Sequence, residues 1–179
     1  MTASAQRRIA IIGAGMSGLV CAEALQSEGC RVVVFDKARG PGGRMSTRRV
    51  PELGEGVGFD HGAQYFTVRS PNFAEAVERW VREGVAATWD GDVVAIGQEG
   101  VTRSQRHTVR YVGVPGMNGI CRSIARSLDV RFGVRVARVV RDGPGWGLED
   151  DRGQPLGRYD VVLCTAPAEQ TAVLLGAAA

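Results

Sequence analysis

Three glycines near the amino terminus have the spacing of a loop that receives the phosphates of a dinucleotide. The segment matches the pattern G-x-G-x-x-G and consists of Gly13, Ala14, Gly15, Met16, Ser17 and Gly18. In such a loop the first glycine permits a tight turn, the second lets the backbone approach a pyrophosphate, and the third lets a helix pack closely on a strand. A helix that begins here adds free N–H groups and the positive end of its dipole. Phosphate binding is therefore the chemistry that this segment predicts.

An acidic residue follows at the place where a dinucleotide has its ribose. Asp36 ends the apolar run Arg31–Phe35, and a carboxylate at this place accepts hydrogen bonds from a ribose hydroxyl. Its charge would repel a 2′-phosphate, so NADP is disfavoured here. The glycine pattern alone is a weak signal, because a glycine-rich turn can also serve packing only. The elements around it must therefore support the interpretation.

Those elements have the order of a right-handed βαβ unit. Arg8–Ile12 and Arg31–Phe35 are short runs rich in β-branched residues, which is typical of buried parallel strands. Between them, Ser17–Glu28 carries apolar residues at helical spacing, and Gly29 supplies a C-cap. The expected fold class is α/β, with a Rossmann-like FAD/NAD(P)-binding domain built on a parallel sheet.

A second glycine cluster separates FAD from NAD as the expected cofactor. A simple NAD-dependent dehydrogenase usually passes from the acidic residue into a crossover helix, whereas here Gly42 and Gly43 precede Arg44. The glycine pair allows a second close approach of the backbone, and Arg44 can hold phosphate oxygens by charge-assisted hydrogen bonds. The alternative is a solvent loop with an incidental arginine.

The rest of the chain is expected to alternate between helices and short strands. A loop is predicted from Lys37 to about Gly62. Helices are predicted at three places: Ser70 to Glu83, with Phe73, Val77, Trp80 and Val81 on one face; around Met117 to Leu128; and Pro167 to Leu175. Two or three strands are predicted over Ala87–Val114, broken at Asp90-Gly91 and at Gln98–His107; a β-meander over Val130–Phe132, Val134–Arg141 and Trp146–Glu149; and a further buried strand at Tyr159–Cys164.

Composition argues against several other classes of protein. The formal charge of +3 over 179 residues is too small to indicate a nucleic-acid or membrane partner. The four cysteines form no C-x-x-C pair, and with only His61 and His107 in addition we expect no metal site and a reducing, cytoplasmic location. Arg7-Arg8 before an apolar stretch resembles an export signal, but glycines interrupt the stretch and no cleavage site follows.

Several segments resemble a known family. The Gly-Gly-Arg segment is similar to the second fingerprint of FAD-dependent amine oxidases, and within that class the chain resembles the bacterial renalase-like proteins. The matching segments occur in one order through nearly the whole chain: Phe35–Lys37, Arg39–Ser46, Asp60–Phe66, Gly113–Met117 and Thr165–Ala168.

This resemblance implies FAD contacts in both halves of the chain. It places Ala14, Met16 and Ser17 at the phosphates, Asp36 and Lys37 at the adenosine ribose, and Arg44 with its neighbours Gly43 and Met45 at the pyrophosphate. Gln64 and Tyr65 would lie near the flavin, and the backbone of Val136 would contact adenine. For Val136, an inward-facing strand residue is an equally good interpretation, and Tyr65 is elsewhere more often a core aromatic.

The resemblance also implies a reaction. Dihydro isomers of NAD(P) would be oxidised through FAD, with oxygen accepting the electrons and forming hydrogen peroxide. The alternatives are an amine substrate, an NAD-dependent dehydrogenase and a non-catalytic nucleotide-binding remnant. We find no Ser-His-Asp or Cys-His set and no clear acid–base pair, so no catalytic residue is assigned.

The expected domain division is discontinuous. Residues 1–68 and 117–179 would form the FAD-binding domain, interrupted at 69–116 by part of an antiparallel-sheet substrate domain. Renalase-like proteins continue for nearly as much chain again, so the sequence is expected to be truncated at its carboxyl end and to be inactive by itself.

Overall fold

The computed structural model describes residues 6–91, 94–98, 100–103 and 108–176. The chain divides into two compact units, one made of residues 1–46 and 121–179 and the other of residues 47–120. The borders of these compact units fall at 46/47 and 120/121. The division into a cofactor domain and a substrate domain at 68/69 and 116/117 stays a prediction.

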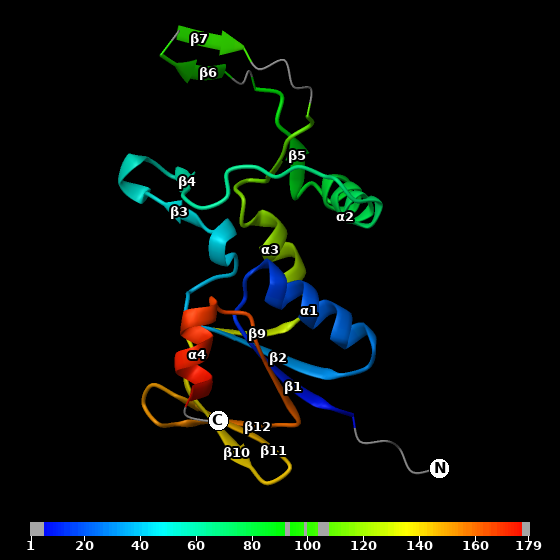
Figure 1. Ribbon diagram of the computed structural model, residues 1–179, viewed down its shortest axis with the longest axis vertical. Helices are drawn as coiled ribbons and strands as arrows, with labels where there is room; N and C mark the ends of the chain where they lie inside the picture. Colours follow the sequence, from blue (N-terminus) through cyan, green and yellow to red (C-terminus); the bar gives the residue numbers. More distant parts are fainter. Residues whose placement is uncertain (1–5, 92–93, 99, 104–107, 177–179) are drawn as a thin grey trace. The chain divides into compact units, whose positions relative to one another are not determined.

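The first unit is built on a four-stranded parallel sheet (Figure 1). In spatial order its strands are β13 (Val161–Cys164), β1 (Arg8–Ile12), β2 (Arg31–Asp36) and β9 (Asp129–Phe132). All three pairings are parallel. Helix α1 (Met16–Ser27) connects β1 to β2, and Gly29, whose φ is +81°, follows its C-cap residue Glu28. The predicted βαβ unit and the α/β fold class are therefore confirmed.

An antiparallel meander covers one face of this sheet. It consists of β10 (Val136–Asp142), β11 (Gly145–Asp150) and β12 (Pro155–Tyr159). The core between the two sheets joins residues of β1 and β2 to residues of the meander: Ala10, Val33, Phe35, Val136, Val139, Leu148 and Tyr159. Because side chains alternate along a strand, the buried Ile9, Ile11 and Val34 face the opposite side, where α1 buries Leu19 and Ala22.

Two strand predictions in this unit are wrong in their pairing or extent. The segment at Val130–Phe132 belongs to β9 and pairs in parallel with β2, not with the meander. The strand predicted at Tyr159–Cys164 is two strands, because Asp160 separates β12 from β13. The Asp160 carboxylate accepts a hydrogen bond from Arg8 N–H at 2.7 Å, which fixes the chain as it passes from the meander into the parallel sheet.

The last two helices begin close to where the sequence places them. Helix α3 (Gly119–Ala125) is shorter than predicted, with Met117 before it and Leu128 after it, although Met117, Ile120 and Ile124 are buried as their spacing indicates. Helix α4 (Ala168–Gly176) agrees with the predicted helix after Pro167.

The described residues of the second unit form one long helix and three antiparallel strand pairs. Helix α2 (Pro71–Arg82) begins as predicted, since the Ser70 hydroxyl accepts a hydrogen bond from Phe73 N–H at 3.3 Å. Val77 and Trp80 are buried, but Val81 is 41% exposed and lies at the edge of the apolar stripe, about 100° around the helix from Trp80. The pairs are β3 (Thr47–Arg49) with β4 (Gly58–Asp60), β5 (Ala86–Thr88) with β8 (Tyr111–Gly113), and β6 (Val94–Gly97) with β7 (Gly100–Arg103).

Two segments predicted as irregular contain short regular elements. The loop predicted from Lys37 to Gly62 contains β3 and β4 and the single 3₁₀ turns η1 (Gly43–Met45) and η2 (Pro51–Leu53). The break predicted at Gln98–His107 contains β7, while residues 99 and 104–107, including His107, lie outside the described residues. None of the helices in the described part of the chain is long and apolar enough to cross a membrane.

Candidate dinucleotide-binding site

The G-x-G-x-x-G segment forms a tight turn between β1 and α1. Gly13 has a φ of +116°, which favours glycine, and its N–H donates to the Phe35 carbonyl at 2.8 Å. The first hydrogen bond of the helix runs from Leu19 N–H to the Gly15 carbonyl at 3.0 Å. The N–H groups of the first turn, at Met16, Ser17 and Gly18, are therefore free of helical partners and available to an anion.

The three glycines are needed for different reasons. A Cβ on Gly18 would lie 2.0 Å from the Gly13 carbonyl oxygen, so the packing of the protein itself requires glycine there. A Cβ on Gly13 would lie 2.6 Å from the Thr165 hydroxyl. For Gly15 the nearest atom would be the Cα of Gly43 at 3.9 Å, which is an ordinary contact. The folded chain thus leaves room at Gly15, where the predicted pyrophosphate would approach.

Asp36 lies beside this turn at the end of β2. One of its carboxylate oxygens accepts a hydrogen bond from Ala14 N–H at 2.6 Å, and the other accepts from Ala38 N–H at 2.7 Å. A carboxylate offers about four lone-pair sites, so each oxygen retains capacity for a further donor such as a ribose hydroxyl. The carboxylate is half-buried, so a ligand can still reach it.

The two glycine clusters meet in space. Gly42 N–H donates to the Ala14 carbonyl at 3.0 Å, and Gly15 and Gly42 form an isolated parallel bridge. A Cβ on Gly43 would lie 3.3 Å from the Cα of Gly15. Arg44 follows directly within η1, and its side chain is exposed. The predicted second loop therefore lies against the phosphate turn at backbone level.

The segment after β9 runs alongside Asp36. Val134 N–H donates to the Asp36 carbonyl at 3.0 Å, and Gly133 N–H donates to the Ala38 carbonyl at 2.9 Å. Val136 begins β10, and its side chain is buried in the core, so the inward-facing interpretation holds for the side chain. A contact between its backbone and adenine stays a prediction. Lys37 Nζ donates to the side-chain oxygen of Gln170 at 3.3 Å.

The residues predicted to lie near the flavin belong to the second unit. Gln64 is exposed, and the Tyr65 ring is 45% exposed and lies 5.9 Å from the ring of Trp89, centroid to centroid. The guanidinium carbon of Arg110 lies 5.3 Å from the centre of the Tyr65 ring. Tyr65 is thus an exposed aromatic residue within this unit, and its place near a flavin stays a prediction.

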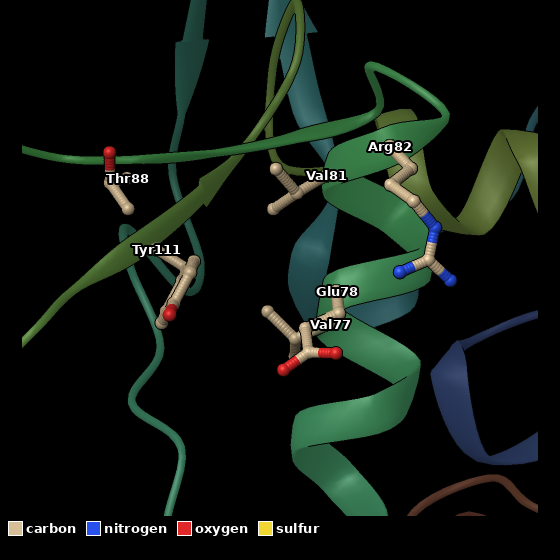
Figure 2. Close-up of a pocket in the computed structure, with 6 residues that line it drawn as sticks. All are labelled: Val77, Glu78, Val81, Arg82, Thr88 and Tyr111. Carbon is tan, nitrogen blue, oxygen red and sulfur yellow. The ribbon is translucent and has the colours of Figure 1, made fainter.

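A hollow of about 350 Å³ lies on the second unit, between α2 and the strands β5 and β8 (Figure 2). It is lined by Val77, Glu78, Val81, Arg82, Thr88 and Tyr111. Its walls contain none of the residues predicted to bind the cofactor. Within the described ranges, no three His, Cys, Asp or Glu side chains gather as metal ligands.

Sequence reasoning missed Thr165 as a residue of the turn. The segment Thr165–Ala168 was noted only for its family resemblance, yet the Thr165 hydroxyl lies 3.1 Å from the Ile12 carbonyl oxygen and 3.3 Å from that of Gly13. The available signal was its position after a buried strand, because the carboxyl ends of parallel strands meet at one edge of a sheet.

Comparison with known proteins supports the fold. Residues 11–83 match the family described as NAD(P)-binding Rossmann-like domains. A zeta-carotene-forming phytoene desaturase from Myxococcus xanthus is 49% identical over 51 residues, which cover 28% of this chain and 10% of the desaturase.

Solved structures of two oxidases superpose on most of the chain. Putrescine oxidase matches with a TM-score of 0.71 at 16% identity, covering 94% of this chain and 60% of its own, and its structure bound to putrescine matches with a TM-score of 0.70. A candidate protoporphyrinogen oxidase from Exiguobacterium sp. 255-15 matches with a TM-score of 0.73 at 12% identity, covering 97% of this chain and 62% of its own. The chain therefore has a Rossmann-like fold and spans about 60% of the length of these solved chains.

Proposed function

We propose that this chain is the nucleotide-binding part of an FAD-dependent oxidoreductase. The observation that carries the proposal is the contact between the two glycine loops. Gly42 is hydrogen-bonded to Ala14, and Gly43 approaches Gly15, so that the loop that carries Arg44 lies against the phosphate turn. A simple NAD-dependent dehydrogenase usually passes from its acidic residue into a crossover helix. This chain instead has a loop with an arginine that can bind phosphate, similar to the second fingerprint of FAD-dependent amine oxidases.

The residues present fit an adenine dinucleotide. The open space at Gly15 lets phosphates reach the free N–H groups of the first turn of α1. Asp36 keeps lone pairs for the ribose while its bonds to Ala14 and Ala38 fix its orientation. Arg44 is exposed and therefore free to approach a phosphate.

Each predicted contact then has a separate task. Met16 and Ser17 donate their backbone N–H groups to phosphate oxygens, while Ala14 lies at the phosphates and its N–H holds Asp36. Lys37 adds charge near the ribose, and Gly43 and Met45 hold Arg44 in its turn. Val136 contributes backbone at the adenine, and Gln64 and Tyr65 orient the flavin ring. The flavin, when bound, supplies the redox chemistry. The chain supplies orientation and exclusion of water.

The finer proposal is a renalase-like reaction in the cytoplasm. A dihydro isomer of NAD(P) is oxidised by two electrons, and oxygen is reduced to hydrogen peroxide. The support is the series of segments that resemble renalase-like proteins in one order along the chain. A second candidate is the oxidation of an amine, which is favoured by the superposition on putrescine oxidase bound to putrescine.

Oxygen consumption by the purified protein distinguishes these functions. Supplied with FAD, a protein that contains this chain and a full substrate domain should consume oxygen with dihydro-NAD(P) isomers, and each oxidised substrate should yield one hydrogen peroxide. Turnover of putrescine instead would support the amine oxidase alternative. Binding of NAD⁺ without binding of FAD would favour a dehydrogenase, and FAD binding without turnover of either substrate would favour a non-catalytic domain.

A further inference from the structure

Thr165 reaches the phosphate turn from a neighbouring strand. Strand β13 pairs in parallel with β1 in the register Ile12↔Cys164, so the next residues, Gly13 and Thr165, lie level with each other. Thr165 N–H donates to the Ile12 carbonyl at 2.9 Å. Its hydroxyl also donates toward the turn, with Oγ1 at 3.1 Å from the Ile12 oxygen and 3.3 Å from the Gly13 oxygen. One hydroxyl hydrogen is thus shared between two carbonyl groups.

The Thr165 hydroxyl oxygen also packs closely against the glycines of the turn. A Cβ on Gly13 would lie 2.6 Å from Thr165 Oγ1, and a Cβ on Gly18 would lie 2.9 Å from it. Two of the three motif glycines therefore pack against this oxygen. The third, Gly15, has no such contact and stays open.

The peptide group between Gly13 and Ala14 is held at both ends. Its oxygen lies within reach of the Thr165 hydroxyl, and its N–H donates to the Asp36 carboxylate at 2.6 Å. Because a peptide group is planar, these two side chains together set the direction of the whole plane. Loss of either side chain removes one of these two restraints and lets the peptide plane tilt, which changes the direction of the N–H groups that follow.

We propose that Thr165 is a positioning residue for dinucleotide binding: its hydroxyl holds the Gly13–Ala14 peptide group so that the turn presents its N–H groups, and Asp36 presents its carboxylate, to the ligand. Thr165 does not itself touch the ligand. The inference rests on the proposed nucleotide site but not on the choice of FAD, because the turn would hold the ADP half that FAD and NAD share.

The test compares four threonine variants by their affinity for ADP and by the unfolding temperature of the ligand-free protein. Thr165→Val keeps the branched shape and removes the hydroxyl, whereas Thr165→Ser keeps the hydroxyl. Thr171→Val is the matched control. The Thr171 hydroxyl, in α4 of the same unit, donates to the Ala166 carbonyl at 3.1 Å and lies 3.2 Å from Cys164 Sγ, and neither contact involves the turn. If Thr165→Val does not fold, Thr165→Ala is compared with Thr165→Ser instead, because these two variants differ only by the hydroxyl group.

We expect Thr165→Val to raise the Kd for ADP about three- to tenfold, as the loss of one hydrogen bond does. Thr165→Ser and Thr171→Val should stay within about twofold of the unmodified protein. The amide proton resonance of Ala14 in the ligand-free protein should shift in Thr165→Val and not in Thr171→Val. This signature reports the orientation of the peptide group rather than stability.

Equal ADP affinity in Thr165→Val and the unmodified protein would overturn the inference, and so would an equal loss in Thr171→Val. If the unmodified protein binds ADP but binds FAD no more tightly, the FAD proposal fails while the Thr165 comparison still decides the inference. Failure of the unmodified protein to bind ADP at all would overturn both the proposed nucleotide site and the inference about Thr165.

Discussion

Replacing Gly15 with alanine should separate folding from dinucleotide binding. Gly15 has a φ of −77° and a ψ of 177°, an extended conformation that any residue adopts. The added Cβ would meet nothing closer than the Gly43 Cα at 3.9 Å. Because alanine also reduces the entropy of the unfolded chain, the free energy of unfolding should stay equal or rise by about 0.4–1 kcal/mol.

Ligand binding should respond in the opposite direction. The new methyl group would occupy the surface at which the backbone meets the pyrophosphate. Forcing an extra methyl group into a close contact costs about 1–3 kcal/mol. The Kd for FAD and for ADP should therefore rise about 5- to 140-fold.

Calorimetric titration with both ligands, together with thermal unfolding of the ligand-free protein, measures the two effects separately. Gly29→Ala is the control for backbone strain alone: its φ is +81° and nothing lies within 4 Å, so it should lower stability and leave the Kd unchanged. Gly18→Ala is the control for a clash, 2.0 Å from the Gly13 carbonyl oxygen, and should lower stability sharply. The reasoning is refuted if Gly15→Ala binds ADP normally, or if it loses as much stability as Gly18→Ala.

Three further substitutions test other parts of the account. Asp36→Ala removes the acceptor of the Ala14 and Ala38 N–H groups and should raise the FAD Kd about tenfold or more, so an unchanged Kd in a folded variant contradicts the ribose assignment. Arg44→Ala should weaken FAD far more than riboflavin, which has no pyrophosphate, while the exposed Arg48→Ala should change little; equal effects of the two variants would contradict the role of Arg44. Burial raises the pKa of the Cys121 thiol from 9.0 to about 11, so the unfolded chain loses this proton first and the free energy of unfolding should fall as the pH rises from about 9 to about 11. Denaturant titrations across that range should show a shallower fall in Cys121→Ala, and an unchanged slope would contradict this effect.

The first unit could be predicted where local signals agree. The β-branched runs, the glycine motif and the Gly29 cap place β1, α1 and β2 to within one residue at each end. Periodicity could not tell that β9 pairs with β2, because Asp129–Phe132 alternates between exposed and half-buried residues as an ordinary antiparallel strand does. That pairing is set by the return of the chain beside Asp36, which is a tertiary contact.

The second unit was harder to predict from the sequence because its strands are short. Four of its described strands have three residues each, too few to establish a period of two. Within the site, the sequence indicated the two glycine loops and Asp36, but it could not indicate that they meet. Thr165 escaped notice for the same reason, since 152 residues separate it from Gly13.

The visible absorption spectrum of the purified protein after incubation with FAD and removal of free ligand tests the central claim most directly. The account predicts the absorption bands of bound oxidised flavin, at one FAD per chain, and their loss in Asp36→Ala and Arg44→Ala. A colourless protein that instead retains NAD⁺ would contradict it.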